Sequence, residues 1–478
     1  MQLEDSRDRR IAQLEAALAE RDALIARLMA RIEALEAQVA RLTRNSTNSS
    51  KPPSSDPPGV ARQQRQPSGK KRGGQPGHKP HQRKLLPPEQ VNALVSLLPK
   101  ECGTCGAKLR GRDPEPLRHQ VVEVPPITPF VTEYEQHALN CEDCGETTRA
   151  ELPIGVPVGA FGPRLSAMLA ICTAKYRLSK RAVRELFCDF LGVELSLGSV
   201  ANIEQQVSAA LAAPVAEARE YVRLAAAVNA DETSWRENKK KAWLWVAATS
   251  WVTVFVLATS RGAKVAKEML GEAFMGVLTT DRWVGYTWVD VARRQICWSH
   301  LIRDFQSWVD GRGAGKRIGL AMLVEARRMF RWWHRVRDGT LSREQFAKRM
   351  RRVQVNVATH LTKASTCRTR RVRGMAKEML KLESAFWTFI ETPGVEPTNN
   401  FGERQIRHAV LWRKGCFGTD SAIGSRFVER MLTTIATLRQ QQRSVLEFIT
   451  TACAADLDAA AAPSLLPGQA HVMLAAAA

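Results

Sequence analysis

Apolar residues recur at alternating steps of three and four positions over the first 42 residues of the chain. They are Ile11, Leu14, Leu18, Ile25, Leu28, Ile32, Leu35, Val39 and Leu42. This spacing is the seam of a coiled coil, interrupted once by Arg21, and the other positions are mostly good helix formers. We therefore predict a coiled coil over residues 1–44 through which copies of the chain associate. An amphipathic helix packed on its own chain is the alternative.

A second helical pattern covers residues 161–215. Apolar periodicity predicts helices over residues 165–174 and 180–191, the latter ended by Gly192, and a third that starts at an N-cap, Ser199. Two helices joined by a short turn with Gly are typical of a helix-turn-helix. We expect a DNA-binding domain here. A plain helical linker domain fits the same pattern.

Strand-like apolar runs replace the helical periodicity from residue 222 to residue 305. Runs at residues 242–249 and 252–258 are separated by a hairpin-length gap, and a helical pattern follows at residues 263–270. Shorter strands lead into Asp231 and Asp281, and another covers residues 295–298. The order predicts an α/β sheet in which the two aspartates end two strands. Such strand ends are where functional sites gather.

Helical periodicity continues over residues 306–391. One face is apolar at Met322, Ala326, Phe330 and Trp333, and we expect it to be core rather than a site. Ser342 and Gln345 have the spacing of a capping box. A basic cluster, which contacts DNA or forms a solvated face, is made of Arg368, Arg370, Arg371 and Arg373. Beyond it, residues 425–453 predict another helix, and the Ala-rich tail over residues 454–478 is expected to fray.

A helix pattern after Pro397 places Glu403 among cationic residues. These are Arg404, Arg407, His408, Arg413 and Lys414. One interpretation is a third metal ligand beside phosphate-binding side chains, and the alternative is a salt-bridged surface glutamate. Together with Asp231 and Asp281 it would form a set of oxygen ligands that suits a hard divalent cation.

Two Cys-x-x-Cys pairs, each followed by Gly, lie within residues 91–155. The four residues are Cys102, Cys105, Cys141 and Cys144. Paired thiolates of this kind favour a structural zinc ion, and residues 120–140 would fold as a hairpin or meander that brings the pairs together. A redox pair is the alternative. Because four thiolates leave no open coordination position, we expect no catalytic role for this zinc.

The charge balance points to a polyanionic partner. The chain of 478 residues has 70 Lys and Arg against 48 Asp and Glu, a formal charge of +22, and a pI near 10.0. Nucleic acid is the simplest partner, and a membrane surface is the alternative. The linker over residues 45–90 carries Lys70, Lys71 and Arg72, which contact DNA phosphates or only keep the chain solvated. No long apolar run or signal-peptide pattern is present, so we expect a cytoplasmic protein without membrane contact.

Taken together, these motifs resemble DDE transposases of the insertion-sequence-66 family, which have a ribonuclease H-like catalytic core. The matching stretches are NSSKPPSSD, RGGQPGH, the pair CGTCG and CEDCG, ADET, TTDRWVGY, CWSH and EPTNNFGERQIR. The resemblance implies that Asp231, Asp281 and Glu403 form the catalytic triad. It implies that Cys297 and His300 support the site without ligating metal, and that accessory transposition proteins take part.

The expected protein is therefore multidomain α/β. We predict a coiled coil (residues 1–44), a basic linker (45–90), a zinc-finger-like domain built on the four cysteines (91–155), a helix-turn-helix-like domain (161–215), a ribonuclease H-like core (222–305 and 392–450), a helical insertion (306–391) and an Ala-rich tail (454–478).

The predicted reaction is cleavage of DNA at the ends of an insertion sequence, followed by strand transfer into target DNA. Two Mg²⁺ (or Mn²⁺) ions would be held by the three acids, with Asp231 bridging both. The partners would be the terminal inverted repeats, target DNA and further copies of the chain, because two ends must be joined. A nuclease or resolvase that cuts without joining and a non-enzymatic DNA-binding regulator are the alternatives.

Overall fold

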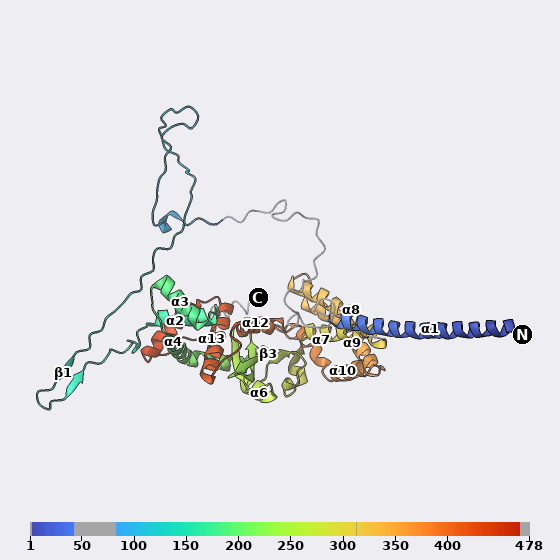
Figure 1. Cartoon of the computed structure of the whole chain (residues 1–478). Coiled ribbons are helices and arrows are strands. Elements are labelled where there is room, and N and C mark those ends of the chain that lie inside the picture. Colours follow the sequence, from blue (N-terminus) through green and yellow to red (C-terminus); the bar gives the residue numbers. More distant parts are fainter. Residues whose placement is uncertain (1, 43–82, 312, 469–478) are drawn as a thin grey trace.

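The computed structural model describes residues 2–42, 83–311 and 313–468, which form a mixed α/β body preceded in the chain by a long helix and an extended segment (Figure 1). The strands are β1 Ala138–Asn140, β2 Thr147–Arg149, β3 Ala227–Glu237, β4 Lys240–Ala248, β5 Thr253–Ala258, β6 Val277–Thr280 and β7 Arg294–Ile296. The helices are α1 Gln2–Leu42, α2 Pro163–Ala174, α3 Lys180–Leu191, α4 Leu197–Ala210, α5 Ala212–Arg223, α6 Ala263–Leu270, α7 Trp298–Val309, α8 Ala314–Arg337, α9 Arg343–Ser365, α10 Arg370–Leu380, α11 Thr388–Glu391, α12 Asn400–Cys416, α13 Ala422–Gln440 and α14 Val445–Leu457. The expected mixed α/β class is confirmed.

The five-stranded sheet has the order β5-β4-β3-β6-β7. The first three strands pair antiparallel, and β6 and β7 are parallel to β3. The predicted hairpin is confirmed as β4 and β5, and the predicted helix over residues 263–270 is α6. The apolar, β-branched and aromatic residues of the hairpin suit strands buried on both faces, and Leu244 and Trp245 are fully buried.

The parallel pairing of β3 with β6 has one offset throughout. Ala227 lies opposite Val277 and Asn229 opposite Thr279, a constant difference of 50 in residue number. Continued by two residues, the same register brings Asp231 level with Asp281 and onto the same face, because side chains alternate along a strand. The prediction that Asp231 ends its strand is wrong. It lies within β3, which extends past the end of β6 to pair with β4.

Helix α13 covers the outer edge of the sheet. Backbone N–H groups at alternate positions of β5, those of Thr253, Phe255 and Leu257, donate to side-chain oxygens of Thr437, Thr433 and Glu429. These acceptors are four residues apart on the helix, a rise of about 6 Å, which matches two residues of strand at about 6.6 Å. The helix therefore supplies hydrogen-bond acceptors for the edge strand β5, whose N–H groups could otherwise pair with another strand.

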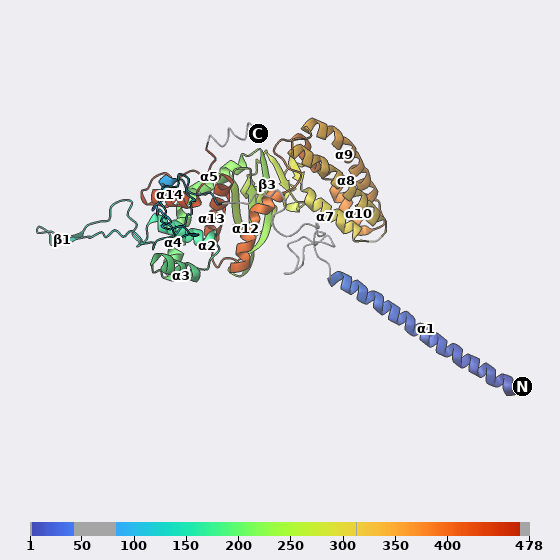
Figure 2. The same ribbon diagram turned by 90° about the horizontal axis from the view of Figure 1, so that it is seen from above.

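The helices from α7 to α11 form a block between β7 and α12 with its own hydrophobic core. In Figures 1 and 2 they lie on the opposite side of β3 from α2, α3 and α4. The predicted apolar face is confirmed as core, with Met322, Ala326 and Trp333 buried and Phe330 packed against them. The predicted N-cap is also confirmed, since the Ser342 side chain accepts from the N–H of Gln345.

The opposite block consists of α2–α5 with α14 and part of α13. Helix α3 has the predicted bounds, and Gly192 ends it in a left-handed conformation with φ 62°. The predicted N-cap of the next helix is wrong by one turn. Ser196 has the extended backbone of a cap and accepts from the N–H of Ser199, which lies in the first turn of α4.

The C-terminal region differs from its prediction in two ways. Residues 425–453 do not form one helix, because the chain turns between α13 and α14 at Gln442, whose φ is 55°. The described part of the tail also packs against the rest of the protein, whereas fraying was predicted. Leu465 is fully buried, and its carbonyl accepts from the side chain of Gln441 at 2.8 Å. Residues 469–478 lie outside the described part.

The N-terminal segments are described in part. Helix α1 carries the predicted seam, and its described apolar side chains are exposed, for example Leu28 at 53% and Ile32 at 50%. Lys70, Lys71 and Arg72 lie outside the described residues.

Each Cys-x-x-Cys pair forms its own tight turn. The N–H of Gly106 donates to the carbonyl of Cys102, and that of Gly145 to Cys141. The segment between the pairs is not the expected hairpin, because only β1 pairs, and it pairs with β2 across the second turn. Among the described residues the four thiols do not gather into one group that could hold a metal. The zinc ion stays a prediction.

Candidate functional site

Asp231 and Asp281 are the acidic side chains that the strand register brings level. The Asp231 carboxylate accepts from the N–H of Glu232 at 2.9 Å, and that of Asp281 accepts from the N–H of Trp283 at 2.8 Å. Burial, together with the charges of Glu232, Asp281 and Glu403, raises the pKa of Asp231 to about 8. Three like charges therefore act on one buried carboxyl, which is unfavourable without a cation.

Glu403 reaches this site from the first turn of α12, which packs against β3 and β4. Asn399, at the N-cap, fixes that helix to the sheet. Its buried side chain accepts from the Asn229 amide at 2.9 Å and donates to the Ala230 carbonyl at 2.8 Å. Its carbonyl accepts from the Glu403 N–H at 3.0 Å. One asparagine thus joins the backbone beside Asp231 to the backbone of Glu403.

Gly402 makes the close approach of α12 possible. A Cβ at this position would lie 3.0 Å from the Asn399 amide oxygen and 3.4 Å from the Asn229 Cβ. A side chain here would push the helix away from the strand that carries Asp231. The sequence TNNFGE, residues 398–403, therefore contains three neighbouring functions: Asn399 fixes the helix to the sheet, Gly402 allows the close approach, and Glu403 supplies the carboxylate.

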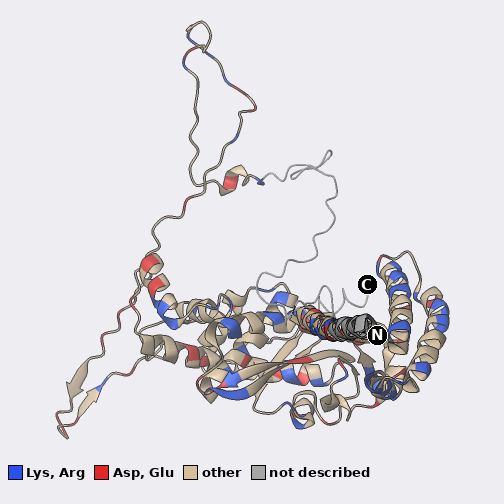
Figure 3. Ribbon diagram, turned by 45° about the vertical axis from the view of Figure 1, so that its right-hand side comes forward, with Lys and Arg blue, Asp and Glu red and all other residues tan. Residues whose placement is uncertain are grey.

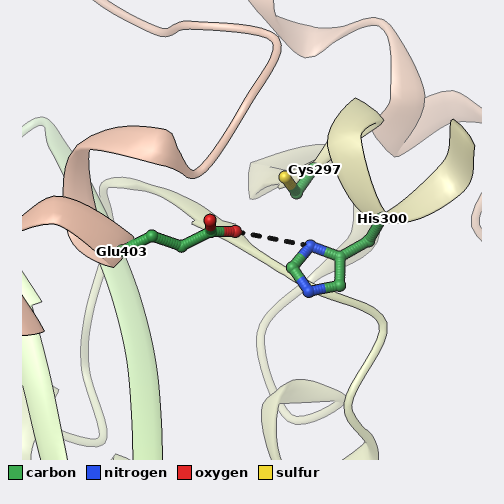
Figure 4. A group of neighbouring side chains, drawn as sticks. All are labelled: Cys297, His300 and Glu403. Carbon is green, nitrogen blue, oxygen red and sulfur yellow. Dashed lines mark ion pairs between the residues drawn. The ribbon is translucent and has the colours of Figure 1, made fainter. Parts of the chain in front are cut away.

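Cys297 and His300 lie at the junction of β7 and α7. Cys297 is buried, and its sulfur accepts from the Asn399 N–H at 3.1 Å. The Nδ1 atom of His300 lies 3.8 Å from an oxygen of Glu403 (Figure 4). Burial, with the charge of Arg303 second, lowers the pKa of His300 to about 4, so the ring is neutral at pH 7. This contact is therefore not an ion pair at neutral pH.

Glu232 is a residue that sequence reasoning missed. It points to the face opposite Asp231 and accepts from the Tyr286 hydroxyl at 2.7 Å and from Arg261 at 2.8 Å. The Arg261 guanidinium lies over the Trp283 ring at 3.9 Å. Burial raises the pKa of Glu232. The sequence ADET could have indicated this role. Glu232 follows Asp231 in a strand, so its side chain faces the opposite side of the sheet, where a buried carboxylate needs hydrogen-bond partners of its own.

A cavity of about 400 Å³ opens beside Asp281. It is lined by Asp281, Arg282 and Trp283 after β6, by His300, Arg303, Asp304 and Ser307 of α7, and by Arg371 of α10. Arg282 pairs with Asp304 at 2.5 Å. The cavity therefore joins one acid of the cluster to cationic side chains of the helical block. Figure 3 shows that Lys and Arg also occur along the other helices of the body.

The cationic residues predicted on α12 fall into two groups. Arg404, Arg407 and Lys414 are exposed. His408 and Arg413 instead hold the helix in place. The His408 ring lies 3.0 Å from the Ala174 carbonyl, and Arg413 donates to Thr233 at 3.0 Å. Burial lowers the pKa of both side chains. Both side chains therefore make contacts within the fold, and their contact with phosphate stays a prediction.

Comparison with known families identifies the protein as a transposase. The model described as "Transposase IS66 family" matches residues 158–426, more than half of the 478 residues. The chain belongs to that family, and the matched range contains Asp231, Asp281 and Glu403. Residues 4–84 match a family of unknown function (DUF6444). A search of curated proteins finds no match.

Membership of this family assigns the protein to DNA transposition and implies that it binds DNA. In the described part of the chain, every helix is too short or too polar to cross a membrane.

Proposed function

We propose that the chain catalyses metal-dependent DNA strand cleavage and strand transfer at the ends of an insertion sequence, with Asp231, Asp281 and Glu403 as catalytic residues. The observation that carries this proposal is that Asp281 and Glu403 both lie near enough to Asp231 for their charges to raise its pKa. The three acids come from the central strand, from the end of its parallel neighbour and from the helix across them. The sheet order, with three antiparallel strands followed by two parallel ones, supports a ribonuclease H-like core.

The three carboxylates fit Mg²⁺ or Mn²⁺. An oxygen of Glu403 is buried and has no hydrogen-bond partner among the described residues, and Asp231 is buried among like charges. A hard divalent cation would satisfy both, since Mg²⁺ binds carboxylate oxygens. When bound, two such ions supply the activation of an attacking hydroxyl and the stabilisation of the leaving oxygen in phosphodiester cleavage.

The remaining residues position the acids and the DNA. Asn399 and Gly402 set the distance of Glu403 from β3, and Glu232 with Tyr286 supports the opposite face of the strand. The exposed cations of α12 and the basic linker, including residues 70–72, would contact phosphates.

The cavity beside Asp281 is the proposed path of the DNA strand at the cleaved bond. His300, Arg303 and Arg371 face it from the helical block, while Asp281 faces it from the core. A phosphodiester passing between these walls would meet cations on one side and the metal-binding acids on the other. In this proposal the helical block acts as a clamp on the substrate.

The assembly is proposed from the N-terminal regions. The exposed seam of α1 would join copies of the chain, since two element ends must be held together. The two Cys-x-x-Cys turns would share a structural zinc ion, and α3 with α4 would recognise DNA. Accessory proteins and the cytoplasm as the site of action belong to the same proposal, as do the predicted domain boundaries.

A cleavage and strand-transfer assay tests the function. Purified full-length protein is incubated with Mg²⁺ or Mn²⁺ and with DNA that carries the sequences flanking the gene. We expect metal-dependent joining that disappears in Asp231→Asn and persists in Asp420→Asn, which changes an exposed aspartate between α12 and α13. Cleavage without joining would favour a nuclease or resolvase. Tight binding with no reaction, even with added accessory proteins, would favour a regulator.

A further inference from the structure

The cluster of Cys297, His300 and Glu403 has the composition and spacing of a transition-metal site. The Cys-x-x-His pair starts α7, and one donor atom of each residue lies within 4.8 Å of the other two. Figure 4 shows the His300 ring directed toward the Glu403 carboxylate, with Cys297 close by. Residues more than 100 positions apart in the chain are thus brought together by the packing of α12 on β3.

Two atoms of the cluster lack partners. His300 Nδ1 and Glu403 Oε1 are both buried and make no hydrogen bond to any described residue. They face one another at 3.8 Å, which is too long for a hydrogen bond. Buried polar atoms of this kind are rare in folded proteins and call for a ligand. A cation between them would satisfy both.

The geometry needs little adjustment for zinc. Ligand bonds of about 2.0–2.3 Å in a tetrahedral site place the ligand atoms roughly 3.3–3.8 Å apart. The separation of His300 Nδ1 from Glu403 Oε1, 3.8 Å, lies at the upper end of this range, so a bound ion would draw the two atoms slightly together. The Cys297 sulfur accepts the Asn399 N–H, a contact that offsets part of the rise in pKa that burial causes for this thiol. Three protein ligands of this kind leave the fourth position open.

We propose that Cys297, His300 and Glu403 bind a thiophilic divalent cation of the zinc class, and that its binding inhibits the enzyme. A sulfur, nitrogen and oxygen donor set favours Zn²⁺ over Mg²⁺, which takes oxygen ligands. Because Glu403 is shared, a bound Zn²⁺ ion withdraws this carboxylate from the three-acid site. The inhibition rests on the proposed function, whereas the binding does not.

The binding is tested with Co²⁺, a spectroscopic substitute for Zn²⁺ whose thiolate absorption reports a bound cysteine. Full-length protein is titrated with Co²⁺ alone, and the Cys-x-x-Cys turns contribute equally in all variants. We expect the wild type to take up one more equivalent than Cys297→Ser, with Cys416→Ser, an exposed cysteine of α12, behaving like the wild type. Equal uptake by the wild type and Cys297→Ser would overturn the proposal. If that variant does not fold, His300→Gln replaces it with the same expectation.

The inhibition is tested by adding Zn²⁺ to the Mg²⁺-dependent cleavage reaction. We expect Cys297→Ser to need more than about tenfold more Zn²⁺ for half-inhibition than the wild type. Replacing a residue that only hydrogen-bonds to a metal ligand already lowers metal affinity by about tenfold or more, and Cys297 is proposed as a ligand itself. The same half-inhibiting concentration in both would overturn this part. Asp231→Asn separates the two proposals, because it should keep the additional Co²⁺ equivalent even though it does not cleave DNA.

Discussion

Replacing Asn399 tests whether this residue positions Glu403. Asn399→Ala removes two buried side-chain hydrogen bonds and leaves the Ala230 carbonyl and the Asn229 amide without partners. Each buried group left unpaired costs about 1–3 kcal/mol, so the free energy of unfolding should fall by about 2–6 kcal/mol. The neighbouring Asn400 is exposed, and its side chain accepts one hydrogen bond from the described residues, that of the Ser299 hydroxyl at 3.2 Å, so Asn400→Ala should cost about 1 kcal/mol or less.

The catalytic effect should be larger than the loss of stability suggests. The start of α12 would shift relative to β3, and a displacement of about 1 Å at a reacting group lowers activity on the order of 100-fold. We expect DNA cleavage by Asn399→Ala to fall by about that factor at a temperature where the variant is folded. Binding to DNA should change little, because this side chain lies in the interior.

Thermal unfolding, a DNA-binding titration and the cleavage assay are run on both variants in parallel. The reasoning is refuted if Asn399→Ala unfolds and cleaves like the wild type, or if Asn400→Ala is equally damaged. Asn399→Asp provides a second test. It keeps the acceptor for Asn229 but sets a carboxylate oxygen against the Ala230 carbonyl, so it should not restore activity.

The other predictions concern the acids, the cavity, the sheet edge and the zinc site. Asp281→Asn should abolish cleavage and keep DNA affinity, and cleavage at the normal rate would remove Asp281 from the site. A neutral methylphosphonate at the cleaved bond should weaken DNA binding by the wild type, because it removes the charge that Arg371 would contact. Arg371→Ala should bind normal DNA more weakly and lose less affinity on this replacement. Arg368→Ala, which lies outside the cavity, should lose as much affinity as the wild type. Burial raises the pKa of Glu429 from 4.5 to about 7, so the folded protein holds this proton more tightly than the unfolded chain. The resulting stabilisation is fully present below pH 4.5 and is lost as the pH rises through 7. Denaturant unfolding should show the wild type losing about 3 kcal/mol relative to Glu429→Gln across that window, and parallel pH profiles would disprove it. Cys102→Ser should remove the bound zinc and loosen residues 100–145 alone, and finding no zinc in the wild-type protein by elemental analysis would count against the four-cysteine site.

Local patterns predicted most of the elements. The apolar and β-branched runs of β4 and β5, the bounds of α3 and α6, and the buried face of α8 follow from periodicity and capping over a few residues. The errors also lie at this level. Ser196 rather than Ser199 caps α4, because the backbone conformation decides between two serines with similar sequence surroundings.

The candidate acids were available from the sequence, whereas their environment was not. Glu403 lies 122 positions after Asp281, and no periodicity connects them. Their proximity depends on the single register of β3 with β6 and on the anchoring of α12 by Asn399. The contacts of His408 and Arg413 within the fold were unpredictable for the same reason, since a cationic residue on a basic helix has the same sequence pattern whether it faces solvent or a neighbouring segment.

The sequence by itself determined the mixed α/β class, the family, the strongly basic charge and the choice of the three candidate acids, because these depend on residue type and short-range spacing. Only the tertiary structure decided that Asp231 lies within its strand, that Glu232 turns to Tyr286, and that Cys297 and His300 face Glu403. Those contacts join distant parts of the chain through strand register and helix packing, which are properties of the folded whole and leave no local pattern.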